Sequence, residues 1–167
     1  MRKSIFAILV LLVLGIAVAG YPLNVLVLSN NDEIISLQVV KPNDTFLLGY
    51  FHSVALSDVW ERFVIDADYR IVLTETMFQG QGAGLPSSLS DGEKLTRDGR
   101  WFRITGMRRI VPSLYWRVET RWHNRFRFNN EQEQDISSCV GDSLVLIRVQ
   151  QMNVPAFLIH YLTGRTL

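Results

Sequence analysis

The chain has 167 residues, a formal net charge of +1 and a single cysteine, Cys139. One cysteine cannot form an intramolecular disulfide, so a disulfide-stapled scaffold is excluded, and we expect Cys139 to be a buried, small apolar residue. No Cys-x-x-Cys, His-Glu-x-x-His or carboxylate-rich calcium loop occurs, so nothing in the sequence supports a metal site. The length favours a single domain with one core.

The first nineteen residues predict export. Arg2 and Lys3 precede an uncharged apolar run from Ile5 to Ala19, and Ala17-Val18-Ala19 is the small-x-small pattern that precedes a signal peptidase site. Residues 1–19 are therefore interpreted as a signal peptide whose removal leaves Gly20 first, or alternatively as an uncleaved anchor. Both interpretations place the folded part outside the cytoplasm.

Alternation of apolar and polar residues, broken by turn residues, dominates the rest of the chain. Short connections between many strands favour antiparallel neighbours, so residues 20–152 are predicted to form an all-β domain, a single antiparallel sandwich or small barrel. Residues 153–167 are an apolar tail, expected to pack on the domain as a short helix or strand. The expected strands are Val25–Ser29, Ile34–Val40, Phe46–Val54, Val59–Asp66, Arg70–Phe78, Trp101–Thr105, Leu114–Trp122, Phe126–Phe128 and Leu144–Gln150.

The strands on either side of Leu56-Ser57 predict a polar pair. A two-residue turn there, or a four-residue turn over residues 55–58, sets His52 directly opposite Glu61 on one face of the hairpin, about 5 Å apart at Cβ. Such a pair is either structural or functional. Ser53 points to the opposite face from His52, which weakens a hydrolase built on these residues, although the sequence leaves that alternative open.

The segment Gly80-Gln81-Gly82-Ala83-Gly84-Leu85-Pro86 follows a strand but is not followed by a helix, as a dinucleotide-binding motif would require. We interpret Gly82, Gly84 and Pro86 as part of a tight crossing or of a loop that contacts a ligand.

Basic residues concentrate in one part of the sequence. Residues 94–127 hold ten basic residues against Asp98 and Glu119 only. These arginines either pair with acidic strands inside one sheet or form a positive surface for lipid headgroups, an anionic small molecule or an acidic protein. We expect Arg117 and Arg121 on the exposed face of a hairpin in which the loop 123–125 sets Trp122 against Phe126 and Thr120 against Phe128.

Several of these motifs together resemble a known family. The string Phe51-His52-Ser53-Val54, Glu61 with Phe63 two positions on, Phe78, and the run from Gly82 to Pro86 are similar to an exported bacterial family, a domain of unknown function often encoded beside TRAP transporters of the TAXI subclass. Its His-Ser pair maps onto His52 and Ser53, its acidic position onto Glu61 and its glycine-rich turn onto Gly82 to Pro86. Ser57-Asp58 departs from the expected Thr-Pro.

The resemblance implies a periplasmic accessory protein of a TAXI-type TRAP solute uptake system, without catalytic activity, that binds the solute receptor, the permease or the anionic solute. The alternatives are a stand-alone periplasmic module that binds a ligand or lipid, and a hydrolase using His52 and Glu61. No cofactor, no metal and no nucleic acid is expected. The candidate binding residues are His52, Ser53, Glu61, Gly82, Gly84, Pro86, Arg117 and Arg121.

Overall fold

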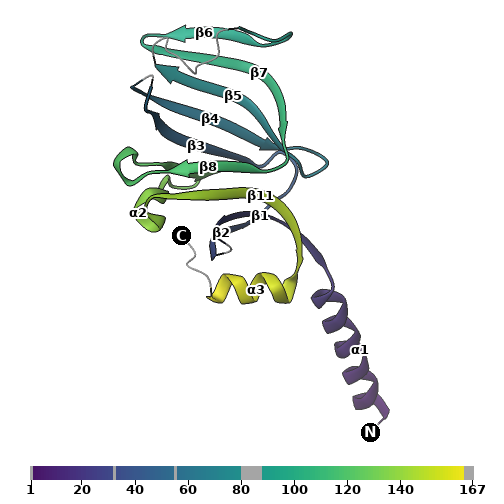
Figure 1. Cartoon of the computed structure of the whole chain (residues 1–167). Coiled ribbons are helices and arrows are strands. Elements are labelled where there is room, and N and C mark those ends of the chain that lie inside the picture. Colours follow the sequence, from purple (N-terminus) through teal and green to yellow (C-terminus); the bar gives the residue numbers. More distant parts are fainter. Residues whose placement is uncertain (1, 32, 55, 80–87, 164–167) are drawn as a thin grey trace.

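Two antiparallel sheets face each other in the computed structural model of the chain (Figure 1). The structure describes residues 2–31, 33–54, 56–79 and 88–163. Neither sheet closes on itself among these residues, so the predicted all-β sandwich is confirmed and the barrel alternative is not.

The strands are β1 (Pro22–Asn30), β2 (Glu33–Val39), β3 (Thr45–His52), β4 (Ser57–Ile65), β5 (Ile71–Gln79), β6 (Lys94–Asp98), β7 (Trp101–Val111), β8 (Leu114–Val118), β9 (Arg125–Phe128), β10 (Gln134–Asp135) and β11 (Ser143–Asn153). The helices are α1 (Arg2–Ala19), α2 (Ile136–Val140) and α3 (Val154–Thr163), with a 3-10 turn, η1 (Thr120–Trp122).

One sheet has the strand order β2-β1-β11-β8 and the other the order β10-β9-β3-β4-β5-β7-β6. The larger sheet extends past the edge strand β8 of the smaller one, so that β5, β7 and β6 lie beyond the four-stranded sheet (Figure 1). The inner-face side chains of β4, β5 and β7 in this part of the sheet therefore pack against one another rather than against the smaller sheet. They form a small separate cluster of Val59, Phe78, Ile104 and Met107.

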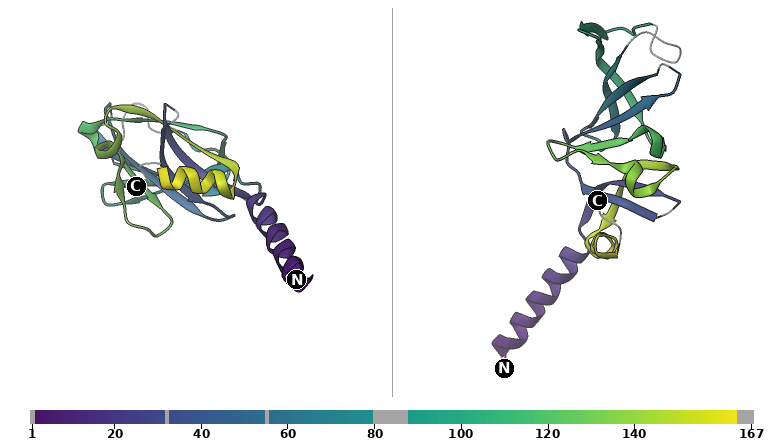
Figure 2. Two further views of the ribbon diagram at one scale, coloured as in Figure 1. Left: turned by 90° about the horizontal axis from the view of Figure 1, so that it is seen from below. Right: turned by 90° about the vertical axis from the view of Figure 1, so that its left-hand side faces the viewer.

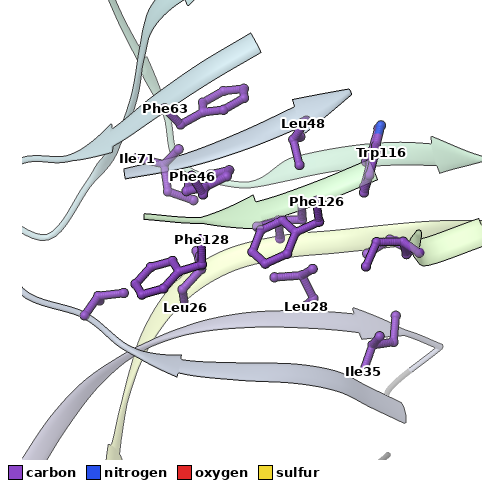
Figure 3. Packing of buried hydrophobic residues seen from close by; sticks show 14 of the residues in the cluster. Leu26, Leu28, Ile35, Phe46, Leu48, Phe63, Ile71, Trp116, Phe126 and Phe128 are labelled. Atoms are coloured by element: carbon purple, nitrogen blue, oxygen red, sulfur yellow. The ribbon is translucent and has the colours of Figure 1, made fainter. Parts of the chain in front are cut away.

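The main core lies between the two sheets (Figure 3). It follows from the period of two in each strand, which sends every second side chain to the inner face. Phe46 and Phe63 stack there with ring centroids 4.8 Å apart. The large buried residues around them are Leu26, Leu28, Leu48, Ile65, Ile71, Trp116, Phe126, Phe128, Val145 and Ile147.

Strand β1 is buried on both faces, because α3 covers the outer face of the four-stranded sheet (Figure 2). Phe157 of α3 packs against Val25, Val27 and Leu37 on that face. This explains why residues 25–28 form a continuous apolar run rather than an alternating one. The predicted tail is thus a helix that packs on the domain.

Two predictions of strand content were incomplete. Strand β7 continues to Val111 because Gly106, with a φ of 77°, allows a bulge there. A Cβ at this position would lie 2.4 Å from the carbonyl oxygen of Gly92. Strand β6 was missed because all five of its residues are exposed, so no apolar alternation marks it.

The predicted hairpin of residues 114–122 with 126–128 is wrong. Strand β8 pairs with β11, whereas β9 pairs with β3 in the other sheet. The chain changes sheet through η1, where His123 has the left-handed φ of 48°. Asn124 fixes this crossing, because its side chain accepts from Glu119 N at 3.0 Å and donates to Arg117 O at 3.1 Å. Trp122 and Phe126 therefore do not form a cross-strand pair.

The predicted cross-strand pairing of His52 with Glu61 is also wrong. In the β3–β4 hairpin His52 pairs with Ser57, and Glu61 pairs with Leu48. The far end of the hairpin sets this register, since Asn43 N donates to Ile65 O at 2.8 Å and the Phe46–Phe63 stack follows. The register differs from the predicted one by four residues, an even number. Both side chains therefore stay on the predicted face, at different positions along it.

Helix α1 projects away from the sandwich, and its described apolar side chains from Ile8 to Val18 are exposed (Figure 1). None of the helices in the described residues has the length and apolarity needed to cross a membrane. Cys139 is exposed on α2, so the prediction that it is buried was wrong. It lies on the outward side of a single helical turn whose buried residues are Ile136 and Ser137.

Candidate functional site

Glu61 is the one charged residue in a row of five side chains on the inner face of the seven-stranded sheet. Strand pairing places Ile104, Thr76, Glu61, Leu48 and Phe126 side by side across β7, β5, β4, β3 and β9. The other four members of the row are buried. The row thus places one carboxyl group among buried side chains that carry no charge.

A cavity of about 370 Å³ lies beside Glu61, where the edge of the smaller sheet meets the larger one. Its volume falls within the range typical of small-molecule sites. The walls come from β3, β4 and β8 and from the crossing through η1. They are Leu48, Tyr50, Phe51, His52, Ser53, Glu61, Leu114, Tyr115, Trp116, Arg117, Glu119, Trp122 and Asn124.

Burial raises the pKa of Glu61 to about 7, because the charged form loses hydration; Arg109 opposes the rise only in part. The guanidinium of Arg109 is engaged elsewhere, with Glu93 at 2.9 Å. Burial, reinforced by the Glu61 charge, also raises the pKa of Tyr50 well above its usual value. At pH 6 both groups therefore carry protons that they can donate.

Trp116 presents a second donor. The residue is only 5% exposed, and its Nε1 is buried with no acceptor among the described residues. Figure 3 shows the indole beside Leu48, with its nitrogen on the side away from Ile35. A buried N–H without a partner costs about 1–3 kcal/mol, so this donor calls for an acceptor oxygen in the cavity.

The crossing through η1 closes one end of the cavity. The rings of Phe51 and Trp122 stack with centroids 4.6 Å apart, which ties the end of β3 to η1. Neither Trp116 nor Trp122 was singled out from the sequence as a site residue, and neither was Tyr50. An inward-facing tryptophan on a strand is usually a core residue, so the sequence does not mark it as a binding residue. That the Trp116 N–H has no partner among the described residues follows from the packing of β8 in the fold.

The structure brings together four of the candidate residues. His52, Ser53, Glu61 and Arg117 all line the cavity, although His52 and Glu61 are not cross-strand partners. Gly82, Gly84 and Pro86 lie outside the described residues. Within the described part of the chain, no group of three or more His, Cys, Asp or Glu side chains is arranged to hold a metal ion.

Arg121 does not line the cavity. Its Nε lies 2.7 Å from Glu119 Oε2, and its guanidinium carbon lies 4.6 Å from the ring centroid of Trp122. Arg121 therefore packs against the ring of Trp122, a residue that does line the cavity. It was predicted to contact a partner directly.

Comparison with known families gives one match. The model described as Domain of unknown function (DUF1850) matches residues 46–134, a range that includes every residue lining the cavity. No curated protein and no solved structure matches the chain. The predicted resemblance to a domain of unknown function is confirmed, whereas export and the link to TRAP transporters stay predictions.

Proposed function

The chain belongs to the family described as Domain of unknown function (DUF1850), and from this premise we propose that it is a binding protein, without catalytic activity, for a small carboxylate held in the cavity between Glu61 and Trp116. The observation that carries the proposal is the Trp116 N–H, which is buried, unpaired among the described residues and part of the cavity wall.

The donors of the cavity define the ligand chemistry. The Trp116 N–H, the Tyr50 hydroxyl and the protonated Glu61 each offer a proton, so the complementary ligand group carries two or more acceptor oxygens. Arg117 in the same wall adds a positive charge. A carboxylate satisfies both requirements, and the apolar Leu48 and Leu114 in the wall suit a short hydrocarbon body.

The ionisation of Glu61 adds a pH dependence to this proposal. Below its pKa of about 7 Glu61 donates to a carboxylate, whereas above it two carboxylates repel each other. Binding is therefore expected to be tighter at pH 6 than at pH 8.

Fluorine NMR of protein labelled with 5-fluorotryptophan tests the proposal. The chain has four tryptophans, of which Trp116 and Trp122 line this cavity. Titration with butyrate is expected to move the Trp116 and Trp122 signals, assigned by single Trp→Phe replacements, while the uncharged butyramide binds more weakly. Trp116→Phe keeps most of the ring and removes the N–H, so it should weaken binding about tenfold.

Matched carboxylate variants complete the experiment. Glu61→Gln is expected to abolish the difference between pH 6 and pH 8, whereas Glu131→Gln, which removes an exposed carboxylate, should leave it unchanged. Butyrate that leaves both signals unmoved, or equal affinity at the two pH values in the unaltered protein, would contradict the proposal.

For the setting of this activity we propose the periplasm and an accessory role beside a TAXI-type TRAP system. The support is the basic-apolar leader of residues 1–19 and the sequence resemblance, in which the family's His-Ser and acidic positions fall on His52, Ser53 and Glu61. These three residues line the same cavity. The solute of the transporter would then be the carboxylate.

Two measurements test this setting. Intact mass of protein from an osmotic-shock fraction should correspond to a chain that begins at Gly20; Met1 retained in the membrane fraction would replace secretion with anchoring. Affinity purification from the native envelope should co-elute the permease or the solute receptor. Recovery of the protein without either would favour the stand-alone binding module.

A further inference from the structure

A second, larger hollow lies on the opposite, outer face of the seven-stranded sheet. Its volume is about 510 Å³, and no described helix covers this face (Figures 1 and 2). It shares no lining residue with the Glu61 cavity. The lining residues are Leu47, Trp60, Met77, Thr96, Arg97, Asp98, Trp101, Arg103, Arg127 and Glu133.

One wall of the hollow is a tryptophan held in place by its neighbours. Trp60 and Gly49 are cross-strand partners, and a Cβ at Gly49 would lie 2.7 Å from two carbons of the Trp60 ring. The ring therefore occupies the space that a side chain at residue 49 would need. The Arg125 guanidinium carbon lies 4.5 Å from the ring centroid, which adds a cation–π contact.

The floor beside this ring is apolar. Strand pairing places Met77 next to Trp60, and Leu47 lies in the neighbouring row between Arg62 and Arg127. Leu47 is buried although it points to the outer face. A flat, apolar molecule in the hollow would thus pack against Trp60 and Met77, above the buried Leu47.

The arginines of the hollow differ in their partners. Arg103 Nε lies 3.4 Å from Glu75 Oε1, and Arg97 Nε donates to Gly99 O at 3.0 Å. Arg127 has no ion pair with any described residue, and its Nε is buried without an acceptor. The Nε–H of this guanidinium is therefore a donor that an acceptor oxygen of an anion would satisfy.

We propose that this hollow is a second ligand site, for an organic anion with a flat apolar body whose acid group binds Arg127 and whose body packs against Trp60 and the apolar floor. This site would explain the concentration of basic residues in residues 94–127, because that segment supplies Arg97, Arg103 and Arg127 to the wall. The contacts predicted for Arg117 and Arg121 are separate from this site, because neither residue lines the hollow. The inference does not rest on the function proposed for the Glu61 cavity.

The same fluorinated protein tests this site separately, because Trp60 and Trp101 line the outer hollow. Titration with 2-naphthoate is expected to move the Trp60 and Trp101 signals. The uncharged analogue 2-naphthylmethanol should bind at least about tenfold more weakly, since it cannot accept a charge-assisted hydrogen bond from Arg127.

Matched arginine variants identify the anchor. Arg127→Gln should weaken 2-naphthoate about tenfold or more, whereas Arg148→Gln removes the same charge from an exposed position on β11 and should leave the affinity unchanged. Unchanged Trp116 and Trp122 signals in each variant establish that the fold is intact. If Arg127→Gln does not fold, Arg97→Gln, an exposed member of the wall, replaces it and should weaken binding about threefold.

Three results would overturn the inference. They are equal affinity for the acid and the alcohol, equal affinity in Arg127→Gln and Arg148→Gln, and a response to 2-naphthoate confined to Trp116 and Trp122. A response at Trp60 and Trp101 without any butyrate response at Trp116 would support the outer site and contradict the carboxylate cavity. The two proposals therefore fail independently.

Discussion

In the described part of the chain, the two faces of the seven-stranded sheet give carboxylates different environments: burial without an ion pair on the inner face, and ion pairs with arginine on the outer face. Glu61 on the inner face has no ion pair among the described residues, and burial raises its pKa. Glu75 on the outer face lies 3.6 Å from Arg62 and 3.4 Å from Arg103, with a side chain that is only 14% exposed. The two glutamates lie on neighbouring strands but on opposite faces, and of the two only Glu75 has an arginine within 4 Å among the described residues.

The two faces also contribute differently to the stability of the fold. The inner face supplies most of the stability, because its rings and aliphatic side chains leave water. The outer face holds arginines in ion pairs that contribute only about 0–1 kcal/mol each. Changes on the two faces should therefore differ in both size and kind.

The largest expected effect compares adjacent residues of β4. Phe63→Ala removes a ring that is 1% exposed and stacked on Phe46, so it should lower the free energy of unfolding by about 3–5 kcal/mol. Arg62→Ala, one residue away on the outer face, should cost no more than about 1 kcal/mol. Urea unfolding measures both, and similar losses would break the division between the faces.

The second effect is the pH dependence that Glu61 gives to stability. Its pKa rises from 4.5 in the reference state to about 7 in the fold. A raised acid pKa stabilises the fold below pH 4.5, and this contribution is lost as the pH rises through 7, on the order of 3 kcal/mol in all.

Glu61→Gln removes that titration. The free energy of unfolding of the variant, minus that of the unaltered protein, should therefore increase between pH 5 and pH 8. Urea unfolding across this interval checks the sign. A difference that stays constant would place Glu61 in water rather than in a desolvated cavity.

The third effect tests the close approach of Trp60 to the backbone. Gly49→Ala forces a methyl group into the Trp60 ring and should cost about 1–3 kcal/mol. In a Trp60→Leu background the smaller side chain leaves room, so the cost should fall below about 1 kcal/mol. Additive costs in the double-mutant cycle would show that the ring does not lie over residue 49.

The smallest effect concerns the contact between Arg125 and Trp60. A double-mutant cycle with Arg125→Gln and Trp60→Leu should give a coupling of about 0.5–1 kcal/mol, typical of an exposed cation–π pair. The coupling should persist in 0.5 M salt, whereas the ion pairs of Arg125 with Asp58 and Glu133 weaken. A coupling that disappears in 0.5 M salt would show that it arises from the ion pairs of Arg125 and not from the cation–π contact.

The sequence determined the class of fold and, in the alternating strands β3 and β4, the face of each residue. Alternation with a period of two predicted the antiparallel sandwich. It also placed His52 and Glu61 on the same face, and this placement survives any shift of the hairpin register by an even number of residues. It could not predict the cross-strand partner of either residue, because the register depends on Asn43 and Ile65 at the other end of the hairpin. The sequence therefore predicted the face on which both residues line the cavity, but not their positions along it.

The basic segment shows the same limit. The sequence determined that arginines concentrate in residues 94–127, but the tertiary structure decided which of them face a hollow. Arg117 is on β8 and Arg127 on β9, and these strands belong to different sheets because the chain crosses at η1. A local pattern records which side of a strand a residue occupies. Which strand lies beside it depends on contacts between residues far apart in the chain, such as Leu47 with Arg127, and no local pattern contains them.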